Sequence, residues 1–118
     1  MKESFNDEFR RRTKQNALAI IKLFSIMKSR EELRIIGKQL IRSGCSVAAN
    51  FRASCRARSR AEHYSKLCIV VEECDETLFW LEMIEEAGLI DSKTLTPIKQ
   101  ETLSILQVLS KARKNLKN

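Results

Sequence analysis

The sequence predicts an all-α protein, an antiparallel four-helix bundle with up-down-up-down connectivity. The 118-residue chain contains only three glycines and one proline, whereas a β-sheet protein needs a turn about every 8–12 residues. Four segments carry apolar residues at steps of three and four, which is the spacing of one helix face. The connections between these segments are short, and short connections favour antiparallel neighbours.

A single domain is expected over residues 1–118, because a chain of this length can bury a core without disulfides or metals. Its charged residues, 31% of the chain, are typical of a folded and strongly charged protein. The N-terminal residues lack the apolar core of a signal peptide, and no window approaches the roughly 20 apolar residues of a membrane span. We therefore expect a cytoplasmic protein that does not enter a membrane.

The first helix is expected over about residues 6–28. One side of it carries Phe9, Thr13, Ala17, Ile20, Phe24 and Met27. The segment Ser29-Arg30-Glu31-Glu32 then has the S-x-x-E form of a capping box. In such a box the hydroxyl accepts a hydrogen bond from a backbone N–H of the new helix and the glutamate reaches back, so a second helix should begin here.

The second helix is expected over about residues 31–56. Its apolar arc, about 100° wide, contains Leu33, Ile36, Leu40, Val47, Phe51 and Cys55. Gly37 and Gly44 fall in the same arc, although each costs about 1 kcal/mol relative to alanine inside a helix. We interpret both glycines as structural, at points where another backbone approaches closely. The alternative is a break in the helix near Gly44.

The third helix is expected over about residues 60–87. A second capping box, Ser59-Arg60-Ala61-Glu62, precedes it. Gly88 can adopt the left-handed conformation that ends many helices, with Leu89 in apolar contact with the last turn.

The fourth helix is expected over about residues 92–115. Thr96-Pro97 offers an alternative start, because proline fits the first helical position and threonine can cap. The inward positions are expected to be Ile98, Leu103 or Leu106, Leu109 and Ala112.

The third helix carries more apolar surface than one core requires. A first stripe faces the core and consists of Tyr64, Leu67, Cys68, Val71, Cys74, Leu78 and Leu81. A second stripe on the far side consists of Ile69, Trp80, Met83 and Ile84. Because contiguous exposed apolar patches usually mark contact sites, we predict that the second stripe is a self-association face. The alternative is that the first or fourth helix covers it within one subunit.

Positive charge is concentrated around the second helix. Within an arc of about 80°, opposite the apolar arc, this helix carries Arg34, Lys38, Arg42, Arg52 and Arg56. The following residues add Arg58 and Arg60. Guanidinium groups match phosphate oxygens, so this ridge predicts sequence-tolerant binding of RNA or DNA. An anionic membrane surface fits less well, since the ridge lacks a flanking Trp or Leu face.

The third helix offers a structural alternative for the ridge. Its acidic run comprises Glu72, Glu73, Asp75, Glu76, Glu82, Glu85 and Glu86. These carboxylates can pair with arginines of a neighbouring helix or a neighbouring subunit. The corresponding alternative function is a protein–protein scaffold whose charges serve assembly or the recognition of an acidic partner.

No pattern in the sequence indicates catalysis, a metal or a cofactor. His63 is the single histidine; it has charged neighbours and no glycine-rich elbow, and we predict a surface position for it. The four cysteines, Cys45, Cys55, Cys68 and Cys74, contain no C-x-x-C pair and are expected to be buried free thiols. The sequence therefore predicts a protein that is not an enzyme.

The segment from Ser43 to Ile90 includes SGCSVAANFRASCRARSRAEHYSKL and EECDETLFWLEMIEEAGLI. It resembles the four-helix-bundle family of proteins encoded in intervening sequences of bacterial 23S rRNA genes. The matching positions are Ser46, Val47, Ala49, Asn50, Phe51, Arg52, Ala53, Cys55, Arg56, Ala57, Arg58 and Ser59, then Glu72, Glu73, Asp75, Glu76, Thr77, Trp80, Leu81 and Glu82. Cys45, Ala48 and His63-Tyr64 depart from the family pattern.

The resemblance implies a bundle that assembles into a ring, a homopentamer in family members. Relatives include the accessory variability determinant of diversity-generating retroelements, which binds nucleic acid and a reverse transcriptase through a basic surface. The partners implied are thus further copies of the chain, RNA or DNA, and a reverse transcriptase or another protein.

The family pattern also bears on Asn50, to which we assign a structural role. Its side-chain amide would bond to local backbone or to a carboxylate of the third helix. The acidic run would hold Arg52 or Arg56 in the same way. The outward cations would then reduce to Arg34, Lys38, Arg42, Arg58 and Arg60.

Overall fold

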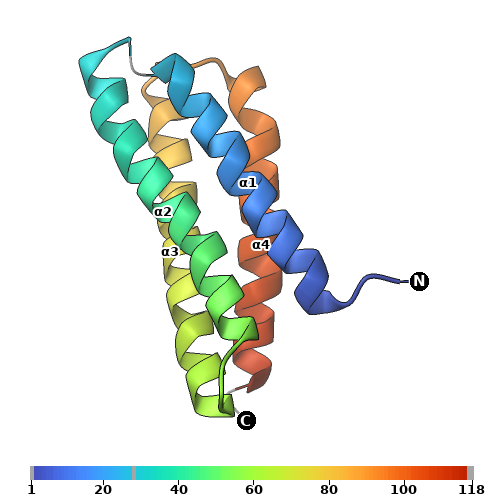
Figure 1. Cartoon of the computed structure of the whole chain (residues 1–118). Helices are drawn as coiled ribbons and strands as arrows, with labels where there is room; N and C mark the ends of the chain where they lie inside the picture. The colour runs from blue at the N-terminus through green and yellow to red at the C-terminus, as the bar shows by residue number, and fades with distance from the viewer. Residues whose placement is uncertain (1, 28, 117–118) are drawn as a thin grey trace.

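The computed structural model describes residues 2–27 and 29–116, and it confirms the all-α class (Figure 1). Four helices form in this part of the chain: α1 (Phe5–Met27), α2 (Glu31–Cys55), α3 (Arg60–Glu86) and α4 (Ser92–Leu116). No described residue lies in a strand. The expected bounds agree with these to within a residue or two, except that Lys28, the predicted end of the first helix, lies outside the described residues.

The helices pack side by side into an elongated body about 44 Å long (Figure 1). α2 packs against α1 and α3, and α4 packs against α3 and α1. Phe24 lies beside Gly37 and Ile20 beside Gly44, so residue numbers fall along α1 as they rise along α2. The same relation holds between α2 and α3, where Ser43 contacts Thr77 and Ser54 contacts His63.

Two apolar clusters form the core, one toward each end of the bundle, and all four helices contribute to both. The first cluster contains Phe9, Val47, Phe51, Leu67, Val70, Val71, Cys74, Ile105 and Leu109. The second cluster contains Ile20, Leu23, Met27, Leu33, Leu40, Leu81, Ile84 and Leu95.

Small polar residues lie between the two clusters along every helix: Thr13, Ser43, Thr77 and Thr102, all buried. The hydroxyls of Ser43 and Thr77 are 2.9 Å apart across α2 and α3. Between α1 and α4, the amide of Asn16 donates to the hydroxyl of Thr102 at 2.9 Å. Each of these buried polar side chains therefore has a hydrogen-bond partner.

The two glycines of α2 make room for side chains of α1. A Cβ atom on Gly37 would lie 2.5 Å from Cδ1 of Phe24, and one on Gly44 would lie 2.7 Å from Cδ1 of Ile20. The close approach expected at these positions is therefore made by side chains, whereas a neighbouring backbone was anticipated. α2 runs through Gly44 without the break that the sequence had left open.

The two capping boxes have different outcomes. Ser59 caps α3 as predicted, accepting a hydrogen bond from the backbone N–H of Glu62 at 3.0 Å. At α2 the prediction was wrong, because Arg30 occupies the N-cap and no side chain caps the helix. Glu32 pairs with the Arg30 side chain instead, at 3.0 Å.

Local backbone hydrogen bonds define the end of α3 and the start of α4. Gly88 has a φ of 69° after α3, and the backbone N–H of Leu89 donates to the carbonyl of Ile84. This is the geometry of a glycine-terminated helix. α4 begins at Ser92, since the carboxylate of Asp91 accepts from the backbone N–H of Thr94, and Pro97 lies inside the helix.

The packing decides two of the expected facings. Ile84, placed in the outward stripe of the third helix, has no exposed surface and belongs to the second core cluster. Of the two alternatives on α4, Leu103 is exposed and Leu106 packs against the first core cluster, with Thr102 and Ile105 buried beside them.

None of the described helices combines the length and apolarity needed to cross a membrane.

Candidate nucleic-acid interface

Three segments meet at one end of the bundle, which we call the basic end: residues 2–14, 52–66 and 111–116 (Figure 1). A cavity of about 360 Å³ is lined by residues of all three, among them Phe5, His63 and Ala112. A guanidinium nitrogen of Arg60 donates to the carbonyl of Leu116 at 2.9 Å. These segments contain 13 lysines and arginines but only four acids, so most of the chain's excess positive charge is gathered here.

Ion pairs hold two cations of the predicted ridge on α2, Arg34 and Arg42. Arg34 pairs with Glu31 of its own helix at 2.6 Å. Arg42 reaches across to α3, where it pairs with Glu73 at 2.9 Å and with Glu76. The acidic run therefore holds Arg42, and the expectation that it would hold Arg52 or Arg56 was wrong.

The C-terminal part of the ridge is more available to a ligand. Arg52 and Arg56 are exposed and, like Lys38, form no ion pair with the described residues. Arg58 has 87% of its side chain exposed and meets Glu62 at 3.4 Å. Surface pairs of this kind contribute only about 0–1 kcal/mol, so phosphate can compete for Arg58.

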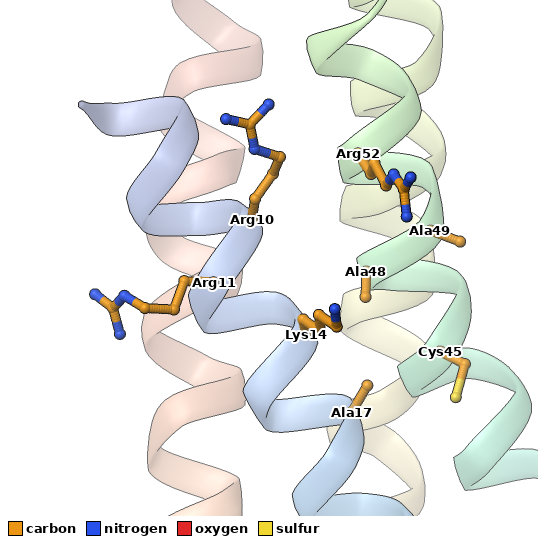
Figure 2. Close-up of a pocket in the computed structure, with 8 residues that line it drawn as sticks. All are labelled: Arg10, Arg11, Lys14, Ala17, Cys45, Ala48, Ala49 and Arg52. Carbon is orange, nitrogen blue, oxygen red and sulfur yellow. The ribbon is translucent and has the colours of Figure 1, made fainter. Parts of the chain in front are cut away.

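The sequence analysis missed three cations on α1: Arg10, Arg11 and Lys14. They line a groove between α1 and α2 with Arg52, Ala17, Cys45, Ala48 and Ala49. Ala17 and Ala48 lie between the two helices and form its floor, whereas Ala49 points away from α1 (Figure 2). The groove has a volume of about 600 Å³. The Arg-Arg-Arg run at residues 10–12 was a visible signal, but nothing local places it beside residue 52.

Arg12, the last residue of that run, joins α1 to α4. Its guanidinium donates to both oxygens of Glu101 on α4, at 2.9 and 2.7 Å, and to the hydroxyl of Ser104. It also lies over the ring of Phe9, 4.7 Å from the centroid. These contacts fix Arg12 between α1 and α4 and leave it out of the basic surface.

Asn50 and His63 both have local partners near the basic end. The amide of Asn50 donates to the carbonyl and the hydroxyl oxygen of Ser46, one turn earlier in α2. His63 was expected at the surface but is half-buried, and its Nδ1 donates to the carbonyl of Ser54 at 2.8 Å. Because a carbonyl can only accept, this nitrogen carries the proton.

The outer face of α3 differs in part from the predicted self-association stripe. Ile69 and Met83 are exposed as expected, whereas Trp80 is half-buried against the second core cluster. Phe79, which the sequence analysis missed, has 48% of its surface exposed and contacts the ring of Trp80. We call the exposed residues Ile69, Phe79 and Met83 the outer apolar strip, in which Phe79 takes the place that the prediction gave to Ile84.

Candidate metal ligands and nucleophiles do not gather in the described part of the chain. No three His, Cys, Asp or Glu side chains there are arranged to hold a metal ion. All four cysteines are free thiols. Burial raises the pKa of Cys74 to about 12, which keeps this thiol protonated near neutral pH.

The fold and the charge distribution define a small all-α bundle with a strongly basic end. The chain belongs to the family of 23S rRNA-intervening sequence proteins, whose family model matches residues 7–111. It is also similar to the crystal structure of a protein of unknown function from the S23 ribosomal protein family of Bacteroides thetaiotaomicron VPI-5482. That similarity has a TM-score of 0.83 at 28% identity and covers 89% of this chain and 97% of the other. No curated protein matches the chain.

Proposed function

We propose that this protein is a non-catalytic bundle that binds nucleic acid through sequence-tolerant contacts between its basic end and phosphate groups. The observation that carries the proposal is the excess of cations over acids in residues 2–14, 52–66 and 111–116. Clustered lysines and arginines release counterions from a polyanion when they bind it, and this release provides most sequence-independent affinity. Membership in a family associated with 23S rRNA genes is consistent with a nucleic-acid ligand.

Within this surface, Arg52, Arg56 and Arg58 are the proposed centre of contact, with Arg60 beside them. Among the described residues Arg52 and Arg56 have no carboxylate partner, and Arg58 has only a weakly bound one. Lys38 extends the surface along α2. Arg34 and Arg42 also belong to the predicted ridge, but they contribute less in this proposal: Arg34 lies near the other end of α2, and Arg42 is held by two carboxylates, Glu73 and Glu76.

A second proposal concerns assembly and is favoured by the outer apolar strip. We infer that antiparallel up-down-up-down bundles associate through Ile69, Phe79 and Met83, with Trp80 at the edge, into a ring-like homo-oligomer. Exposed apolar surface of this kind is typical of a contact site. A scaffold that only assembles, or that recruits a protein such as a reverse transcriptase, is the corresponding alternative function.

The salt dependence of binding tests the nucleic-acid proposal. Fluorescence anisotropy would measure the affinity for a short labelled RNA of mixed sequence, single-stranded and as a duplex, across a series of salt concentrations. Charge reversal at Arg52, Arg56 and Arg58 should weaken binding and reduce the log–log slope. On duplex DNA the reduction is about 0.9 for each phosphate contact that is lost.

The matched control is Arg34→Glu, which makes the same charge change on the same helix, far from the basic end. Its effect should be much smaller, because Arg34 lies near the start of α2, at the opposite end of the helix from residues 52–58. If the variants at residues 52, 56 and 58 bind RNA with the parental affinity and slope, the proposal is wrong. The scaffold alternative then gains support.

A further inference from the structure

The groove between α1 and α2 has cationic walls and a neutral floor (Figure 2). In Figure 2 the side chain of Lys14 reaches from α1 toward α2, while Arg52 stands on the α2 wall and Arg10 on the α1 wall. No acidic residue lines the groove. A groove of this composition favours a ligand that carries negative charge along its length.

Small side chains keep this groove open. Ala17 of α1 and Ala48 of α2 line it between the two helices, and neither side chain extends beyond a methyl group (Figure 2). The volume of about 600 Å³ is within the range of small-ligand sites and suits a segment of a longer chain.

The cations in the groove can exchange their present partners for phosphate. Lys14 and Arg52 form no ion pair with the described residues. Arg10 pairs with Asp7 and Arg11 with Glu3, and all four of these side chains are more than one third exposed. Exposed pairs contribute little free energy, so they do not compete strongly with a polyanion.

We propose that the α1–α2 groove holds one single-stranded segment of nucleic acid, whose phosphates contact Arg10, Lys14 and Arg52 above the floor formed by Ala17 and Ala48. This inference rests on the proposed function and specifies which form of nucleic acid enters the groove. The phosphates provide the charge complementarity, and the sugars lie over the alanines.

The width of the groove is the argument for a single strand. Packed helices have axes about 8–10 Å apart, and a duplex, which carries two sugar–phosphate backbones on the outside of its base pairs, is wider than this spacing. A duplex is therefore too wide to enter between α1 and α2. None of the described residues that line the groove is aromatic, so bases are not stacked and binding should tolerate any sequence.

A steric variant tests the groove without changing any charge. Ala48→Leu should fill part of it, because Ala48 lies between α1 and α2, and circular dichroism would verify that the fold is retained. We expect the affinity for a short labelled single-stranded RNA, measured by fluorescence anisotropy, to fall at least about fivefold, the factor that corresponds to the loss of roughly 1 kcal/mol. Affinity for the duplex of the same sequence should not change. Ala87→Leu is the matched control, since it makes the same change at the far end of α3.

The unmutated protein provides a second readout through Cys45, which lines the groove. Bound single-stranded RNA should slow the reaction of Cys45 with a maleimide, followed by mass spectrometry. Cys68, also half-buried but on α3, is the internal control.

The outcomes separate this inference from the function on which it rests. If Ala48→Leu binds the single strand as the parent does, or if RNA leaves the labelling of Cys45 unchanged, the groove is not the binding site. The proposed function then still stands, provided that charge reversal at Arg56 and Arg58 weakens binding. If the parent protein binds neither the single strand nor the duplex, both proposals fall.

Discussion

Glu76 joins two helices through its carboxylate. It accepts a hydrogen bond from Nε1 of Trp80 at 3.0 Å and pairs with Arg42 of α2. These contacts, the Trp80 hydrogen bond first and Arg42 second, hold the pKa of Glu76 below its usual value. A carboxyl group with a lowered pKa in the folded state stabilises the fold only while it is ionised.

Replacement of Glu76 by glutamine should reduce the dependence of stability on acid pH. In the parent protein the contribution of Glu76 is fully present above its unfolded-state pKa, near 4.3, and is lost as the pH falls through the lower folded-state pKa. The difference in free energy of unfolding between parent and Glu76→Gln should therefore shrink as the pH is lowered from about 6 to about 3. Urea unfolding at several pH values would measure it.

Glu72→Gln is the control for this experiment, because Glu72 is exposed and has no ion pair within the described residues. Its effect should be small at every pH. A stability difference for Glu76→Gln that stays constant across this pH range would contradict the assignment.

At the scale of the element, two helix starts with the same local sequence pattern differ in structure. Ser59 caps α3, and the carboxylate of Glu62 accepts from the backbone N–H of Arg58 at 3.3 Å. Ser29 does not cap α2, which has Arg30 at its N-cap. An S-x-x-E pattern thus indicates that a helix begins nearby without fixing which residue caps it.

This difference gives a stability prediction. Ser59→Ala should lower the free energy of unfolding by about 1 kcal/mol, the usual effect of removing a capping hydroxyl. Ser29→Ala should have an effect close to zero, because no side chain caps α2. Urea unfolding at neutral pH would measure both. Equal losses for the two variants would show that Ser29 also caps its helix in solution.

Sequence periodicity predicts closely where the helices lie, but it predicts less well which residues are exposed on their outer faces. The spacing of Phe9, Leu40 and Leu67 specifies which side of each helix is buried, since a 3.6-residue repeat depends only on the local sequence. Ile84 was assigned to the wrong face and Phe79 to no face, because α3 is apolar on more than one side. Only its neighbours determine which of these residues is covered.

At the scale of the whole molecule, the basic end arises from the packing of distant segments. Arg52, Arg56 and Arg58 were predicted from their own sequence neighbourhood. The contribution of Arg10 and Lys14 was not, because they are about 40 residues away from Arg52 in the chain and meet it only when α1 packs against α2. Pairing between the acidic run of α3 and the arginine ridge was foreseen as an alternative, but Arg42 was not identified as the arginine that is held, since several arginines of α2 face the same carboxylates in the sequence pattern.

The outer apolar strip leads to a prediction about assembly. If Ile69, Phe79 and Met83 lie between subunits, the parent protein should have a mass in solution that is a multiple of 13.6 kDa, and Phe79→Glu should shift it toward 13.6 kDa. The reason is that a buried, unpaired carboxylate opposes association. Light scattering coupled to gel filtration would measure the mass.

Leu103→Glu is the control, because Leu103 is comparably exposed but lies on α4. Trp80→Glu, at the edge of the strip, should reduce the mass as well. A monomeric parent, or a Phe79→Glu variant with the parental mass, would exclude the strip as an interface.

The hydroxyl groups between the two core clusters determine how far each helix can slide along its neighbour. If α3 moved one turn along α2, Thr77 and Ser43 would lose the hydrogen bond between them, while each kept its bond to a carbonyl of its own helix. The loss of such a hydrogen bond costs about 0.5–1.5 kcal/mol, a penalty that purely apolar helices would not incur. Buried oxygen atoms thus favour one axial register between α2 and α3, and the bond between Asn16 and Thr102 does the same between α1 and α4.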